Sequence, residues 1–196
     1  MNKNISNIES SDKSYIKIDY KDGDLLKVKL LWNTDCDLDL CAFFESKDGS
    51  VGGVFPSEYN HLKQNSMGSL FSPPYIYLMG ETDSFDDVKV CCEEIRVTRL
   101  AEMNSISIVV IDYDSVIDDR DANFSKNEIV LVIETINNGI IKLTLDSDYD
   151  GHIYKVCSII NRDGEIVICR DDTVMHLCDA FEKIHGFSSI LTQDNN

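Results

Sequence analysis

The hydrophobic residues of this chain recur mainly with a period of two, which is typical of β-strands that bury one face. The pattern is clearest where Leu26, Val28, Leu30 and Trp32 alternate with two lysines and a leucine. Shorter apolar segments, bounded by turn-forming residues, follow along the chain. Besides residues 26–32, we expect strands at residues 38–45, 50–55, 88–98, 106–113, 128–136, 140–145, 153–160 and 165–170.

Two of the intervals between these segments have the sequence of tight hairpin turns. Residues 137–139 read Asn-Asn-Gly, and an Asn-Gly pair favours the left-handed backbone of a two-residue turn. Residues 161–164 read Asn-Arg-Asp-Gly, which is a second hairpin signal. The second half of the chain is therefore expected to be a meander of antiparallel strands.

The hydrophobic period changes only near the carboxyl terminus, where it becomes that of an amphipathic helix. We expect Asp172 or Thr173 to be the N-cap of this helix and Gly186 to end it. Its apolar face would consist of Val174, Leu177, Cys178, Phe181 and Ile184.

These elements together predict an all-β protein, a two-sheet β-sandwich of about 8–10 strands with a short C-terminal helix. Residues 15–190 are expected to form this single domain, with frayed ends at residues 1–14 and 191–196. Residues 56–80 are weakly patterned and contain all three prolines, so they are expected to be a long connection. Long connections in compact domains are often functional.

The net charge of the chain limits the classes of partner that it can bind. The 196 residues include 35 acidic side chains, 24 of them Asp, and 18 basic ones, which gives a formal net charge of −17. Such a chain is a poor match for nucleic acid or for an anionic membrane surface, because both attract Lys and Arg. A cationic partner remains open, and the short Asp side chain suits oxygen-lined calcium sites in loops. The alternative is that the acidity only keeps the protein soluble.

The chain is expected to be cytoplasmic. Its first 17 residues lack the apolar core of a signal peptide, and no apolar run approaches the length of a membrane span. The seven cysteines include no CxxC pair and lie mostly in apolar stretches, as buried thiols do. The four histidines, His61, His152, His176 and His185, are scattered and lack the short paired spacing of a zinc site.

The clearest chemical motif is the alternation of Asp35, Asp37 and Asp39 with apolar residues. In an extended chain the three carboxylates would project from one face, about 6.8 Å apart at a rise of roughly 3.4 Å per residue. Calcium would compensate their repulsion; otherwise the row faces solvent and protects an edge strand from aggregation. An EF-hand is excluded, because Leu40 replaces the required Gly and Ser46 the bidentate Glu.

Three further acidic clusters follow. Asp83, Asp86 and Asp87 precede a predicted strand and could supply further ligands, or could form an ordinary acidic loop. Residues 112–121 contain five more Asp. Residues 146–151 match the first half of a calcium loop, but strands are expected on both sides and an Asp-Gly hairpin is the simpler interpretation.

Catalytic motifs are missing from the sequence. There is no GxSxG, HExxH or phosphate-binding glycine loop. A carboxylate pair for glycoside hydrolysis would lack an aromatic platform that the sequence can place beside it, because Trp32 is the only tryptophan. We therefore expect a protein that is not an enzyme.

With these residues assembled, the chain resembles the TerD-domain family of tellurium-resistance and stress-response proteins. Residues 35–43 resemble the family core D-F-D-L-D-x-x-A-F, and residues 59–61 resemble its Tyr-Asn-Asn segment. Residues 80–87 resemble its Gly/Asp-rich loop before a strand. Order and spacing match over roughly residues 25–187.

The resemblance implies a non-catalytic β-sandwich that binds Ca²⁺ through two acidic loops and acts with other proteins of a stress-response assembly. Two alternatives remain open. One is an acidic interaction module that binds a basic partner without metal, and the other is a small-molecule binder that uses residues 71–77. The calcium ligands implied by the resemblance are Asp35, Asp37, Asp39, Asp83, Asp86 and Asp87, with Asn60 as a further candidate.

Overall fold

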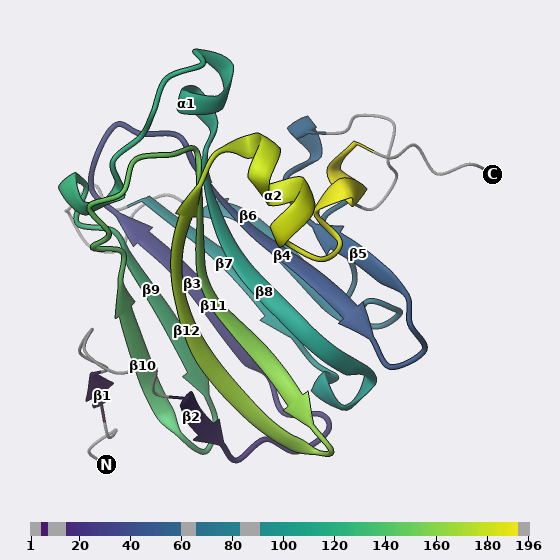
Figure 1. Ribbon diagram of the computed structural model, residues 1–196. Helices are drawn as coiled ribbons and strands as arrows, with labels where there is room; N and C mark the ends of the chain where they lie inside the picture. Colours follow the sequence, from purple (N-terminus) through teal and green to yellow (C-terminus); the bar gives the residue numbers. More distant parts are fainter. Residues whose placement is uncertain (1–4, 8–14, 60–65, 83–90, 192–196) are drawn as a thin grey trace.

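The computed structural model describes residues 5–7, 15–59, 66–82 and 91–191 (Figure 1). These residues form twelve strands in two six-stranded sheets, together with two short α-helices. The two sheets pack face to face, so the expected all-β sandwich with a short C-terminal helix is confirmed. Among the described residues, no helix is long and apolar enough to cross a membrane.

In both sheets every pair of neighbouring strands is antiparallel except β1–β10, which is parallel. The first sheet contains, in spatial order, β1 (Ile5–Asn7), β10 (Gly139–Thr144), β9 (Val130–Thr135), β3 (Leu26–Trp32), β7 (Cys91–Val97) and β6 (Ile76–Thr82). The second contains β2 (Tyr15–Ile18), β12 (Glu165–Met175), β11 (Ile153–Arg162), β8 (Met103–Asp112), β4 (Leu38–Ser46) and β5 (Val51–Val54).

The period of two reflects burial against the opposite sheet. Along β3, every second side chain from Leu26 to Trp32 is buried in the core between the sheets. The second sheet is covered on its outer face as well, by α2 (Leu177–Lys183) and the 3₁₀ turn η4 (Phe187–Ile190), which complete a second apolar cluster. Burial on both faces explains why β4 and β8 have nearly continuous apolar runs instead of alternation.

Three expectations about individual elements were wrong. The segment 56–80 is not a connection throughout, because β6 begins within it at Ile76 and pairs with β7. Residues 146–150 are not a hairpin turn, because they cross from β10 in the first sheet to β11 in the second. The structure also contains β1 and β2, both near the amino terminus, which the periodicity did not predict.

A fourth correction concerns the beginning of the C-terminal helix. Strand β12 continues through Asp172, Thr173 and Val174, because it stays paired with β11 as far as Met175. The helix α2 then begins at Leu177, with His176 as its N-cap residue. Pairing with β11 satisfies the backbone groups of this segment, so the local helical pattern before Leu177 is not realised.

One end of the sandwich carries most of the acidic connections (Figure 1, where α1 (Tyr113–Ile117) and α2 mark it). Strand pairing brings the ends of β3, β8 and β10 to this end, together with the beginnings of β4, β9 and β11. The described connections here, residues 33–37, 113–129 and 145–152, hold ten acidic and two basic side chains. We call this the acidic end. The described turns at the opposite end hold six acidic and three basic side chains, in residues 19–25, 47–50, 98–102, 136–138 and 163–164.

Candidate functional site

A cavity of about 290 Å³ opens at the acidic end, between the ends of β3, β4, β6 and β7. Apolar side chains, among them Trp32, Leu38 and Leu78, form part of its wall. We call it the acidic cavity, because four carboxylates of the described residues line it: those of Asp37, Asp39, Glu58 and Glu93.

The structure brings together two of the three alternating aspartates. Asp37 directly precedes β4 and Asp39 lies within it, so the period of two turns both toward the cavity. Asp35 is exposed, lies in a bend of the 33–37 connection and is not among the residues that line the cavity. The bend returns the chain toward Trp32, whose indole N–H donates to the carbonyl of Cys36 at 3.0 Å. The expectation of a single extended row therefore holds for Asp37 and Asp39 and fails at Asp35.

Asp39 is positioned by a tyrosine from the β5–β6 connection. The Tyr59 hydroxyl donates to Asp39 Oδ2 at 2.7 Å, and its ring packs edge-on against Tyr113, with centroids 5.5 Å apart. Burial, reinforced by the nearby Asp39 carboxylate, raises the pKa of Tyr59 above its ordinary value, so the hydroxyl stays protonated and donates. This contact fixes the orientation of the Asp39 carboxylate at the cavity wall.

Glu93 is the least exposed of the four acids, with 6% of its surface accessible. It lies on β7 in the first sheet, and its Oε2 accepts the backbone N–H of Leu40 on β4 in the second. Sequence reasoning missed this residue. The alternation along the strand could have revealed it. Glu93 lies on the same face of its strand as Ile95 and Val97, both fully buried, so it is an acid at a core-facing position.

Four of the residues that the resemblance implies as ligands lie outside the described residues, so their role as ligands stays a prediction. They are Asn60, Asp83, Asp86 and Asp87.

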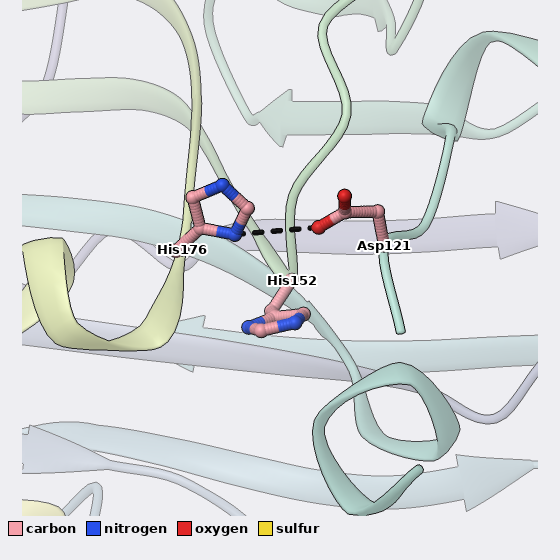
Figure 2. A group of neighbouring side chains, drawn as sticks. All are labelled: Asp121, His152 and His176. Atoms are coloured by element: carbon pink, nitrogen blue, oxygen red, sulfur yellow. Dashed lines mark ion pairs between the residues drawn. The ribbon is translucent and has the colours of Figure 1, made fainter. Parts of the chain in front are cut away.

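A second group of potential ligands lies elsewhere at the acidic end. Asp121, His152 and His176 place one ligand atom each within 4.8 Å of one another (Figure 2). His176 Nδ1 lies 3.3 Å from Asp121 Oδ1, and the two imidazole rings meet edge to face with centroids 5.4 Å apart. We call these three residues the His–Asp group. The interpretation of the histidines as scattered was wrong for this pair, because strand pairing joins residues 24 positions apart.

Other acids at this end have structural partners. Asp112 is buried and caps α1, accepting the N–H of Ser115 at 2.8 Å. Asp146, in the segment that resembles half a calcium loop, pairs with Arg170 at 3.0 Å. Asp150, in the same segment, accepts from the side-chain amide of Asn123 at 2.8 Å. These contacts hold the connections of the acidic end in place.

The buried cysteines have the character of core residues. Cys41 and Cys157 are fully buried, and loss of solvation raises the pKa of each thiol above its ordinary value. Since the thiolate is the nucleophilic form, burial makes these two thiols unreactive.

Comparison with known proteins supports the fold alone. No family model and no curated protein matches the chain. A solved structure titled as a protein of unknown function, SAV2460, is similar with a TM-score of 0.50 and 12% sequence identity. The alignment covers 79% of this chain and 93% of that one, so the likeness extends over most of the sandwich.

Proposed function

We propose that the protein is a non-catalytic calcium-binding domain whose ion is held in the acidic cavity. The observation that carries this proposal is the convergence of Asp37, Asp39 and Glu93 on one cavity from opposite sheets. Glu58, from the 3₁₀ turn η1 (Ser57–Tyr59), adds a fourth carboxylate to its lining. The resemblance to the TerD-domain family points to the same ion.

The chemistry of the lining residues favours calcium over softer metals. Calcium takes six to eight oxygen ligands at about 2.3–2.6 Å, and carboxylates supply one or two each. The described lining residues include four carboxylates and the hydroxyls of Ser57 and Tyr113, but neither His nor Cys. A zinc or copper site would need those nitrogen or sulfur donors. Asp37, Asp39 and Glu93 therefore would hold the ion, and calcium is the cation that this donor set suits.

An ion in this cavity would connect the two sheets at their acidic end. Asp37 directly precedes β4 and Asp39 lies near its beginning, whereas Glu93 belongs to β7. Neutralising part of the local charge would change how a protein partner docks on this end, which is the role we propose within a cytoplasmic stress-response assembly.

The test is calcium binding by the chelator-stripped full chain, measured by titration calorimetry and thermal melting. Calcium should raise the melting temperature, because a ligand bound only by the folded state adds about 2.7 kcal/mol of stability at a hundredfold excess over Kd. Asp37→Asn should remove most of the binding heat and of the shift. Asp148→Asn, an exposed acid at the same end but outside the cavity lining, should leave both unchanged.

Two outcomes would reject the proposal. One is calorimetry without heat together with melting that calcium does not change. The other is equal loss of binding in Asp37→Asn and Asp148→Asn, which would indicate a diffuse charge effect. Partner binding that is sensitive to salt but insensitive to chelator would favour the metal-independent interaction module instead.

A further inference from the structure

We propose that the His–Asp group is a second cation site, which binds a divalent transition metal of the zinc class through Asp121, His152 and His176. Two imidazoles and a carboxylate are a known ligand set for zinc sites with three protein ligands, in which water takes the fourth position. The same set is a poor match for calcium, which prefers oxygen alone. This proposal is independent of the acidic cavity, which shares no residue with the group.

The strand ladder brings the two histidines together. His152 directly precedes β11 and His176 directly follows β12, and the last pair of these strands is Ile153 with Met175. A bulge between Lys155 and Cys157 shifts the pairing by one residue, so that Ile153 pairs with Met175. Both imidazoles therefore lie just beyond the same end of one hairpin.

A second backbone contact brings the Asp121 carboxylate close to the two histidines. Ala122 and Gly151 form an isolated antiparallel bridge with two N–H···O bonds of 3.1 and 3.2 Å, and Asp121 directly precedes Ala122. His152 is anchored as well, since its N–H donates to the Met175 carbonyl at 3.1 Å. The close approach of these segments requires glycine at position 151, where a Cβ would lie 2.8 Å from the Met175 oxygen. The backbone of all three ligands is thus fixed without a metal.

The side chains need only a small movement to close on an ion. Ligand atoms around a tetrahedral zinc lie about 3.3 Å apart, given metal–nitrogen distances of about 2.0–2.1 Å. The His176–Asp121 separation of 3.3 Å already has this value, and the remaining distances are at most 4.8 Å. The side chains of His176 and Asp121 are 57% and 54% exposed, so rotation about their side-chain bonds is not opposed by packing.

Metal binding has a specific consequence at α2. His152 Nδ1 accepts the backbone N–H of Leu177 at 3.3 Å, near the beginning of that helix. A metal on Nδ1 would replace this contact, and a metal on Nε2 would leave the remaining proton on Nδ1, which then could not accept. In both cases the Leu177 N–H loses its acceptor, so its amide resonance reports occupancy of the site.

The experiment titrates the full chain with Zn²⁺ against a chromophoric chelator and with Co²⁺ by visible absorption. It uses a Cys178→Ser background, because Cys178 is an exposed thiol two residues from His176. We expect one saturable site, a Co²⁺ spectrum without thiolate charge-transfer bands, and a shift of the Leu177 amide resonance. His176→Ala and Asp121→Asn should each weaken binding at least tenfold. His185→Ala removes an exposed histidine outside the group and should leave binding unchanged.

The proposal would be overturned if Zn²⁺ did not bind saturably, or if His176→Ala and His185→Ala weakened Zn²⁺ binding equally. Thiolate bands in the cobalt spectrum would also reject it, because they would place the ion on cysteine. Metal-free circular dichroism and melting of each variant show that it is folded. The Asp37→Asn variant separates this site from the acidic cavity. Its zinc affinity should equal that of the wild type, so either proposal can fail without the other.

Discussion

The carboxylate of Glu93 on β7 accepts the backbone N–H of Leu40 on β4, so a buried acid joins the two sheets directly. The reason lies in the short edge strand β5, whose pairing with β4 extends only as far as Ala42 opposite Val54. The N–H of Leu40 lies beyond the end of that ladder, where a buried donor needs another acceptor. Glu93 supplies the acceptor that a longer β5 would have supplied.

This contact makes Glu93 a test of stability as well as of ion binding. Glu93→Leu leaves the Leu40 N–H without this acceptor and should lower the free energy of unfolding by about 1–3 kcal/mol in urea titrations. Glu93→Gln keeps an acceptor oxygen at the same place and should cost clearly less, while it weakens calcium binding. Equal stability of the two variants would show that the hydrogen bond across the sheets contributes nothing.

The sequence predicts the strands whose buried positions alternate visibly, and it fails where strand pairing overrides a local turn or helix signal. Strand β3 was predicted to the residue, because Leu26 to Trp32 alternate against a single buried face. Strand β6 was missed, because Pro73 and Pro74 shortly before Ile76 suggest a loop, although the segment pairs with the next strand, β7. Asp172 and Thr173 likewise were expected to cap the C-terminal helix, although β12 continues through them.

The candidate sites divide in the same way. Asp37 and Asp39 could be found because their spacing is local. Glu93 could have been found from its place on the same face as Ile95 and Val97, but only once that face of β7 is known to point into the core. The meeting of His152 with His176 depends on the register shift between β11 and β12, and a one-residue shift of register has no signature in the sequence.

Two glycines form a matched pair for testing close packing beside the acidic cavity. Gly68 and Gly23 both have positive φ, +80° and +93°, but a Cβ at Gly68 would lie 2.1 Å from the Ile76 carbonyl oxygen, whereas one at Gly23 meets nothing within 4 Å. Gly23→Ala should therefore cost only backbone strain, about 1–2 kcal/mol. Gly68→Ala should cost at least about 2 kcal/mol more, because the clash displaces β6. Urea titration of both variants measures the difference, and equal costs would contradict the packing argument.

Removal of the Arg170 side chain should be costly for stability. Only 6% of its side chain is exposed, and it donates to Asp172, to Asp146 at 3.0 Å and to the Thr144 carbonyl at 2.9 Å. These contacts connect β12 to the 145–152 connection. Arg170→Met should lower the free energy of unfolding by about 2–4 kcal/mol, since hydrogen bonds to charged groups contribute about 1.5–3 kcal/mol.

The matched control for Arg170 is an exposed ion pair. Lys183 pairs with Asp179 one turn away on α2 at 2.9 Å, with about half of each side chain exposed. Lys183→Met should cost only a few tenths of a kcal/mol, as solvated helix pairs do. If the two variants were equally stable, the buried contacts of Arg170 would contribute no more to stability than an exposed ion pair.

Alkaline pH should destabilise the fold through two tyrosines, the half-buried Tyr20 and the buried Tyr154. Burial raises the pKa of Tyr20 to about 12, and burial together with Asp172 raises the pKa of Tyr154 further. An unfolded tyrosine ionises near pH 10, so between about pH 10 and 12 the unfolded state has fewer bound protons and stability falls as pH rises. Each tyrosine contributes at most about 1.4 kcal/mol per pH unit. Urea titrations at pH 9 and pH 11 should therefore show a larger loss in the wild type than in Tyr20→Phe. Identical losses would mean that Tyr20 ionises in the folded protein as readily as in the unfolded chain.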